Sequence, residues 1–308
     1  MGHNLIMQSL FKTNKTILMR HKKIIIIYLI PLFIIFPIVL TAQIKGGLFD
    51  IIGNKELDSG FVRVYYNFSQ IDSTQNKKYD ERYMRIDIQC LEIGSQISKY
   101  YSYAVVHNDS LLRAWLKKNP STGYIPGWIT TIASSHSWSE YRYSVCFKNF
   151  TDNQLTLYTQ MTNRAPDYQY SENLHMQNWE IQDDTLTIAG YLCQKAGCHF
   201  RGRDFIAWFT PDIPINNGPW KFGGLPGLIM KVSDKNDIFV FECVRVEQKD
   251  FKICMPDFSK YGKIDRIKLS KFIIDLHEDY PKMAGQRNAD GTPRSIPSEY
   301  PYRPLELE

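Results

Sequence analysis

The sequence lacks the compact motifs by which many catalytic and cofactor sites are identified. It has no Gly-x-Ser-x-Gly nucleophile elbow and no His-Glu-x-x-His zinc motif. The glycines of the run 218–227 do not precede a predicted helix, so they do not form a phosphate-binding loop. Cys193 and Cys198 lie five positions apart, but no second closely spaced pair completes a zinc site. We therefore predict no catalytic residue, no metal site and no cofactor.

The chain also has no excess of charge once its first 42 residues are set aside. It has 37 Lys and Arg residues and 32 Asp and Glu residues. Five of the basic residues and none of the acidic ones fall in 1–42, so the remainder is balanced. A neutral, mixed surface has no electrostatic footprint for nucleic acid. We exclude nucleic acid as a partner.

Residues 1–42 have the pattern of an export signal. A basic region precedes an apolar run, Ile24 to Leu40, and Leu40-Thr41-Ala42 is an acceptable cleavage site. Met19 would begin a signal of more ordinary length. The alternative is an uncleaved anchor, because the uncharged span 24–44 is near the length that crosses a bilayer. In both cases the remainder lies outside the cytoplasm, in the periplasm, on the cell envelope or secreted.

Residues 43–308 are expected to form a single domain. Aromatic residues make up 14% of the chain, and no Ser/Gly/Pro-rich linker divides it. Six cysteines lie in this part, and an even number in an exported protein permits disulfides. Cys193 and Cys198 fall on one predicted strand, where five residues span about 16 Å. A disulfide needs Cα atoms within about 7 Å, so these two should not bond each other unless the Ala196-Gly197 step breaks the strand. We assign the cysteines a structural role.

The hydrophobic pattern predicts a mainly β, α+β fold. Short polar turns between sequential strands favour an antiparallel meander, and a curved half-barrel is one form it can take. Two helices are expected, at 110–118 with Asp109 or Ser110 as N-cap, and at 264–279 with Leu269, Phe272, Ile273 and Leu276 on one face. Asp183-Asp184 is predicted as a turn. The expected strands are 60–68, 82–94, 141–147, 154–161, 178–182, 187–200, 204–210, 227–233 and 238–248.

The run 216–229 predicts a rigid corner between two strands. Gly218, Pro219, Gly223, Gly224, Pro226 and Gly227 are its turn-forming residues. Pro226 and Gly227 fit the two central positions of a type II turn, the second of which requires a positive φ. The residues of this run shape backbone and core, so its role is expected to be mainly architectural.

Several motifs resemble those of one family. Gly190 to Ala196, Phe200 to Arg203, Ala207 to Ile215, Gly218 to Ile229 and the ending Pro301 to Glu308 are similar, in the same order, to segments of the GLPGLI family. That family consists of exported proteins of Bacteroidetes. The resemblance implies export, and it implies neither a reaction nor a ligand.

Five side chains near the corner are candidates for a binding surface: Arg203, Trp208, Trp220, Lys221 and Phe222. Their aromatic rings can form walls, and Arg203 or Lys221 can meet an acidic group. The favoured interpretation is that the rings pack in the core, that Arg203 binds turn carbonyls and that Lys221 faces solvent; the binding surface is the alternative. The predicted function is a non-catalytic binding or envelope-assembly protein whose partner is a small or apolar ligand or an envelope protein. The alternative is a secreted hydrolase; Ser134 to Ser137 and Cys198-His199 are its weak candidates.

Overall fold

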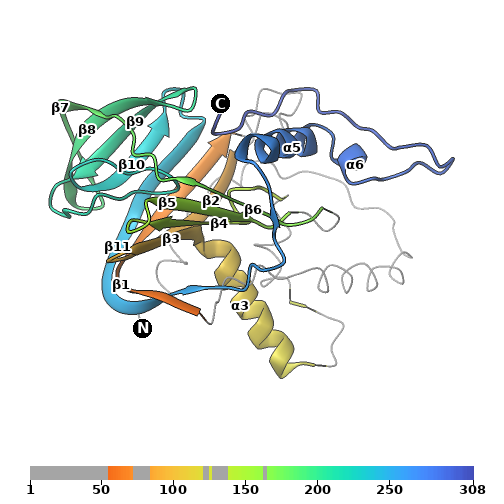
Figure 1. Ribbon diagram of the computed structural model, residues 1–308, viewed down its shortest axis with the longest axis horizontal. Helices are drawn as coiled ribbons and strands as arrows, with labels where there is room; N and C mark the ends of the chain where they lie inside the picture. Colours follow the sequence, from red (N-terminus) through yellow and green to blue (C-terminus); the bar gives the residue numbers. More distant parts are fainter. Residues whose placement is uncertain (1–54, 72–83, 121–124, 127–137, 162–164) are drawn as a thin grey trace, which may run out of the picture. The chain divides into compact units, whose positions relative to one another are not determined.

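The computed structural model describes residues 55–71, 84–120, 125–126, 138–161 and 165–308, which form one twelve-stranded sheet (Figure 1). The predicted signal segment 1–42 and the cluster Ser134 to Ser137 lie outside the described residues. No helix in the described part is both long and apolar enough to cross a membrane. The strands are β1 (Lys55–Ile71), β2 (Met84–Gly94), β3 (Ile97–Ser102), β4 (Ser144–Asn149), β5 (Gln154–Thr159), β6 (Tyr168–Asn173), β7 (Glu180–Ile188), β8 (Tyr191–Phe200), β9 (Arg203–Thr210), β10 (Leu228–Asp234), β11 (Phe239–Met255) and β12 (Gly262–Lys263).

Two antiparallel meanders meet at the centre of the sheet. The strand order is β12-β6-β5-β4-β3-β2-β1-β11-β10-β9-β8-β7. The 17-residue strands β1 and β11 pair from Lys55↔Met255 to Gln70↔Phe239 and join the two halves. β12 pairs with β6 in parallel, and the other neighbours are antiparallel. The edge strands β12 and β7 do not pair, so the described sheet is open. The prediction of a mainly β antiparallel meander with a few short helices is confirmed.

The two faces of the sheet are covered by different parts of the chain. Neighbouring residues of β4 illustrate this: Val145 packs in one hydrophobic cluster and Cys146 in another, because successive side chains of a strand point to opposite faces. The Val145 cluster includes Val105 of helix α3 (Tyr103–Lys118). The other face carries the main core, with the corner, helix α5 (Arg266–Glu278) and the C-terminal segment. Figure 1 shows α3 and α5 on opposite sides of the sheet.

Helix α3 begins earlier than the sequence pattern predicts. Its N-cap is Ser102, whose hydroxyl accepts a hydrogen bond from the Val105 amide at 3.2 Å. Tyr103, Val105 and Val106 have modest helix propensity, but they pack in the hydrophobic cluster on this face of the sheet, and this tertiary packing extends the helix. The predicted caps Asp109 and Ser110 therefore lie inside it. Helix α5 agrees with its prediction, and three of the four residues of the expected stripe, Leu269, Ile273 and Leu276, are buried.

Other differences concern short elements and one turn. β3, β6, β12 and the short helix α6 (Tyr280–Met283) are not predicted from the hydrophobic pattern. Asp183 and Asp184 lie within β7 and do not form a turn. The turn follows at Ala189-Gly190, both with positive φ. β7 is the edge of the sheet and is exposed along most of its length, so polar residues are tolerated within it.

The corner is built differently from the predicted type II turn. Gly227 does not have a positive φ; among the corner glycines Gly224 does, at 91°. Gly227 is needed because a Cβ there would clash with the carbonyl group of Thr210 on β9. A tight turn instead joins Pro219 to Phe222, whose amide donates to the Pro219 carbonyl at 3.0 Å, with Trp220 at a φ of 49°.

Candidate functional site

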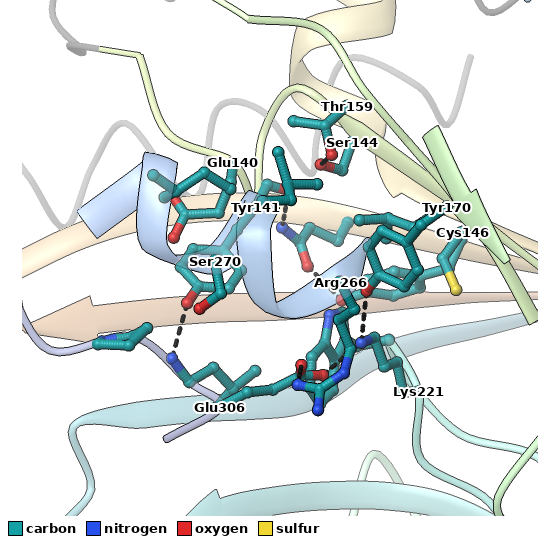
Figure 2. A pocket seen from close by; sticks show the side chains of 18 of the residues that line it. Glu140, Tyr141, Ser144, Cys146, Thr159, Tyr170, Lys221, Arg266, Ser270 and Glu306 are labelled. Carbon is teal, nitrogen blue, oxygen red and sulfur yellow. Dashed lines mark hydrogen bonds and ion pairs between the residues drawn. The ribbon is translucent and has the colours of Figure 1, made fainter. Parts of the chain in front are cut away.

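A small pocket lies where the corner, α5 and the C-terminal segment meet the sheet. Its volume is about 80 Å³, which is room for a few water molecules or one short chemical group. Figure 2 shows side chains from these four parts of the chain converging on it. The lining is mostly apolar; Lys221, Arg266 and Glu306 lie together on one side of the pocket, and Glu140 lies apart from them. The lining residues include Tyr100, Glu140, Tyr141, Cys146, Tyr170, Trp220, Lys221, Phe241, Arg266, Leu269, Ile273, Leu305 and Glu306.

Three cations and two carboxylates form a charged cluster beside the pocket. Lys221 forms ion pairs with Glu306 and with Glu172, whose Oε1 lies 3.3 Å from Lys221 Nζ. Arg201 binds both carboxylates, at 2.8 Å to Glu172 and 3.2 Å to Glu306. Arg266 Nη1 lies 2.9 Å from Glu306 Oε2. These five side chains together carry one positive charge in excess when ionised, and Arg266 Nη1 also donates to the main-chain oxygen of Glu308.

Lys221 is the most buried member of the cluster. Only 3% of its side chain is exposed. The prediction that Lys221 faces solvent is therefore wrong. Burial favours the neutral amine, but Tyr170, Glu306 and Glu172 outweigh burial and raise the pKa of Lys221. Its Nζ donates to the Tyr170 hydroxyl at 2.6 Å and lies 4.9 Å from the centre of the Trp220 ring. Burial likewise opposes ionisation of Glu172, yet Lys221 and Arg201 lower the pKa of that carboxyl.

A second buried lysine holds the corner against the sheet. Lys148 of β4 donates three hydrogen bonds to the corner: to Asn217 Oδ1 at 2.9 Å, to the Gly218 carbonyl at 3.0 Å and to the Phe222 carbonyl at 2.6 Å. No more than 2% of the residue is exposed. The three acceptors lie before and after Trp220 and Lys221, so Lys148 fixes the segment that carries both into the pocket.

Glu140 forms the opposite, polar side of the pocket. His277 Nε2 lies 3.0 Å from Glu140 Oε2, and the Tyr302 hydroxyl donates to Oε1 at 2.5 Å. The His277 and Tyr302 rings stack with centroids 3.9 Å apart. Burial would raise the pKa of Glu140, but interaction with His277 and the hydrogen bond from Tyr302 outweigh burial and lower it. Glu140 is thus held ionised, with both oxygens occupied.

The C-terminal segment, residues 302–308, closes the pocket and is held along its length. Arg203 donates two hydrogen bonds to the Pro304 carbonyl, at 2.7 and 3.2 Å. The Leu305 amide donates to the Tyr141 hydroxyl at 2.9 Å, and the Leu307 amide to the Arg201 carbonyl at 3.0 Å. Leu305 is only 1% exposed.

The structure brings some of the predicted site residues together and separates another. Trp220 and Lys221 line the pocket. Arg203 binds the C-terminal segment, and Phe222 lies in the core, against Phe205 at 4.9 Å between ring centroids. Trp208 is half-buried, and alternation along β9 places it on the opposite face from the buried Arg203 and Phe205. The residues that sequence reasoning missed are Lys148, Glu140, Tyr170, Glu172, Arg201, Arg266 and Glu306.

The cysteines and histidines of the described residues take structural positions. All six cysteines are free thiols, so Cys193 and Cys198 are not bonded to each other, as predicted. His199 Nδ1 lies 2.8 Å from Asp204 Oδ1 in an exposed contact, and His199 is not among the residues that line the pocket. Within the described ranges no group of three His, Cys, Asp or Glu side chains is placed to hold a metal ion.

Comparison with known proteins gives a family match over one short segment and no activity. Residues 201–231 match the model of a protein family described as "protein of unknown function (Porph_ging)". This segment contains the corner and much of the sequence on which the GLPGLI resemblance rests. No curated protein matches the chain significantly.

Solved structures resemble the chain only distantly. Two structures of PNGF-II align with TM-scores of 0.45 and 0.44 at 15% identity, over 72% of this chain and 34% of theirs. An uncharacterized conserved protein from Thermus thermophilus aligns with a TM-score of 0.33 at 5% identity, over 66% of this chain and 90% of that one. The chain thus spans about a third of the length of PNGF-II. These likenesses are too weak to inform function.

Proposed function

We propose that this chain is an exported, GLPGLI-type binding protein whose ligand combines an apolar body with one acidic group. The observation that supports the proposal is the pocket itself. It joins an apolar interior to a charged cluster that has one more cation than carboxylate. Ligand sites commonly combine apolar walls with a few placed polar groups. An acidic ligand group would pair with Arg266, whose side chain is the most exposed of the three cations, at 21%.

The alternative function, a secreted hydrolase, would place its acid–base group at Glu140. A general base works best with a pKa near the operating pH. The pKa of Glu140 is lowered, and both of its oxygens already accept hydrogen bonds or ion pairs. These features favour a structural carboxylate, so binding is the preferred function.

Short ligands that differ only in the end group test the proposal. We would measure the melting temperature of the mature protein with 4-methylpentanoate, 4-methylpentan-1-ol or 4-methylpentylamine at about 10 mM. Binding of the acid at a Kd of about 1 mM would add about 1.4 kcal/mol, or a few degrees. The acid should raise the melting temperature of the wild type and leave that of Arg266→Met unchanged. The alcohol and the amine should leave both melting temperatures unchanged. Equal effects of all three would contradict an anion site.

Export and the absence of turnover need their own measurements. N-terminal sequencing of protein from the periplasmic fraction should give Gln43 as the first residue. An intact apolar segment in the membrane fraction would indicate the anchor instead. A screen of esterase, peptidase and glycosidase substrates should show no turnover. Turnover that disappears in Glu140→Gln would establish the hydrolase alternative.

A further inference from the structure

Three rows of side chains cross β4, β5 and β6 on the face of the sheet that carries the main core. Their members, paired from strand to strand, are Lys148, Leu155 and Glu172 in the first row, Cys146, Leu157 and Tyr170 in the second, and Ser144 and Thr159 in the third. The second and third rows line the pocket, whereas Glu172 of the first belongs to the charged cluster beside it. The floor of the pocket therefore changes along the strands from a charged row, through an aromatic and apolar row, to a row of hydroxyl groups.

Helix α5 covers these rows and begins at the charged end. Arg266 Nε lies 3.6 Å from Glu172 Oε2, which places the start of the helix at the first row. Four residues of the helix line the pocket, namely Arg266, Leu269, Ser270 and Ile273. Their spacing of i, i+3, i+4 and i+7 is that of one helical face, so the pocket is a slot between this face and the rows.

The two hydroxyl groups of the third row have one hydrogen atom without an acceptor. Ser144 Oγ and Thr159 Oγ1 lie 2.8 Å apart, so one of them donates to the other. Among the residues that the structure describes, neither has a second hydrogen-bond partner, and Thr159 is fully buried. Figure 2 shows both on the side of the pocket away from Lys221 and Glu306. A buried donor without an acceptor costs free energy, which an acceptor atom of a ligand would recover.

A carboxylate lies at the same end of the pocket as the hydroxyl row. The Trp138 indole donates at 2.8 Å to the carbonyl of Gln160, the residue after Thr159, and the Trp138 ring lies 5.5 Å from that of His277. His277 in turn contacts Glu140, which lines the pocket. An anionic ligand group is therefore disfavoured at this end. A hydroxyl group is suited to it, because it can accept from the row and donate to a carboxylate.

We propose that the pocket binds a hydroxy acid, whose carboxylate pairs with Arg266 and whose hydroxyl group accepts a hydrogen bond from the Ser144–Thr159 pair. The inference rests on the proposed function, because it keeps the apolar body and the acidic group of that ligand and adds the group at the other end. Glu140 would repel a second carboxylate there, so the ligand is not a dicarboxylic acid.

The spacing of the rows gives the length of the ligand. The first and third rows are four residues apart along the strands, which is about 13 Å. A hydrogen bond of about 3 Å at each end leaves roughly 7 Å between the carboxylate and the hydroxyl oxygen. An extended chain of about six carbon atoms spans this distance, since a carbon–carbon bond is about 1.5 Å long.

Three acids of this length that differ only at the far end test the inference. We would measure the dissociation constants of 6-hydroxyhexanoate, hexanoate and hexanedioate by NMR titration of the mature wild type. 6-Hydroxyhexanoate should bind at least threefold more tightly than hexanoate and at least tenfold more tightly than hexanedioate. A wholly apolar far end would give the opposite order for the first two, because burial of a hydroxyl group without a partner is unfavourable.

A double variant assigns the advantage of the hydroxyl group to the third row. Ser144→Ala with Thr159→Val removes both hydroxyls, and replacement of both partners by apolar groups of similar shape is close to neutral for stability. Thr156 and Ser171 form a similar pair at 2.9 Å that is exposed, so Thr156→Val with Ser171→Ala is the matched control. 6-Hydroxyhexanoate should lose its advantage over hexanoate in the first variant and keep it in the control, while hexanoate binds both within twofold of the wild type.

The outcomes separate this inference from the proposed function. Binding of hexanoate with no gain for 6-hydroxyhexanoate, or a gain that the first double variant retains, would overturn the inference alone. Tightest binding of hexanedioate would also overturn it. Binding of none of the three acids would overturn both proposals.

The wild type alone decides the inference if the first double variant does not fold. The hydroxyl group of 3-hydroxypropanoate is too close to its carboxylate to reach the third row, so this acid should bind no more tightly than propanoate. The same gain from a hydroxyl group at both chain lengths would mean that the hydroxyl has no fixed partner in the pocket, and the inference would be wrong.

Discussion

Lys148 of β4 donates a 2.6 Å hydrogen bond to the carbonyl oxygen of Phe222, and this contact joins the sheet to the corner that carries the pocket lysine. The other two acceptors of Lys148, Asn217 Oδ1 and the Gly218 carbonyl, belong to the same corner. The ammonium group has three donors, and all three have partners. The Lys148 ammonium group therefore has its hydrogen bonds satisfied, but none of these three partners is a carboxylate that would pair with its charge.

This burial predicts an unusual pH dependence of stability. Burial lowers the pKa of Lys148 to about 8, whereas an ordinary lysine has a pKa of about 10.4. Between these values the unfolded chain binds the proton and the folded chain does not, so the contribution of Lys148 to stability rises with pH in that window. Below pH 8 both states are protonated and the contribution is constant.

Comparison of the wild type with Lys148→Met isolates this effect. The variant should be less stable at every pH by about 1–3 kcal/mol, because three buried acceptors lose their donor. The gap should widen by roughly 2 kcal/mol between about pH 7 and pH 10, from urea unfolding at each pH. Lys231→Met, on the partly exposed pair with Glu242, is the control. A gap of constant size for Lys148→Met would contradict the assignment.

Gly227 predicts a stability effect of steric origin. A Cβ at this position would meet the backbone of Thr210, which cannot move aside as a flexible side chain would. Overpacking of this kind costs about 1–3 kcal/mol. Gly190→Ala is the matched comparison, because a Cβ there meets nothing within 4 Å but Gly190 has a φ of 87°. In thermal unfolding Gly227→Ala should lower the melting temperature more than Gly190→Ala does; the reverse order would indicate that backbone strain dominates.

Sequence reasoning identified the fold class and the corner because both depend on local signals. Alternating hydrophobicity and short polar turns specify an antiparallel meander, and the run 216–229 contains enough Gly and Pro to mark a turn. The Gly and Pro content of this run indicates that glycine is needed, but it does not give the physical reason. For Gly227 the reason is its close contact with Thr210 of β9. This is a tertiary contact, which the sequence pattern does not predict.

The sequence pattern identifies only part of the candidate site, because the site is also built from tertiary contacts. Trp220 and Lys221 lie in the distinctive run and were selected, whereas Glu306 is separated from Lys221 by 85 positions in the chain. Lys148 does not fit the alternating pattern of β4, because it is a charged residue at a position that faces the core. Nothing in the spacing of these charges indicates that they converge.

Lys221 predicts a loss of stability that a surface lysine would not give. Lys221→Ala leaves Glu172 and Glu306 with Arg201 and Arg266 as their remaining partners. We expect a cost of about 3 kcal/mol, the lower end for a broken buried ion pair, because these two arginines still neutralise the carboxylates. Lys231→Ala should change stability by no more than about 0.5 kcal/mol. Urea unfolding of the two variants at neutral pH makes the comparison, and equal values would mean that Lys221 is solvated.

The thiols predict slow chemistry in the folded protein and complete labelling after unfolding. Burial raises the pKa of Cys146 and of Cys193 to about 11, and the thiolate is the reactive form. Cys198 and Cys254 are partly exposed, whereas the other four are buried. At about pH 7.5 a disulfide reagent such as DTNB should therefore label at most these two in the native state.

The same protein, purified without reductant, should yield six thiols in concentrated guanidinium chloride. The two measurements differ only in whether the protein is folded. The difference between the two thiol counts therefore measures how many thiols are buried. A count of four or two thiols after unfolding would mean that disulfides form in the protein. In that case the structural role assigned to the cysteines would include cross-linking, and reduction would lower the melting temperature.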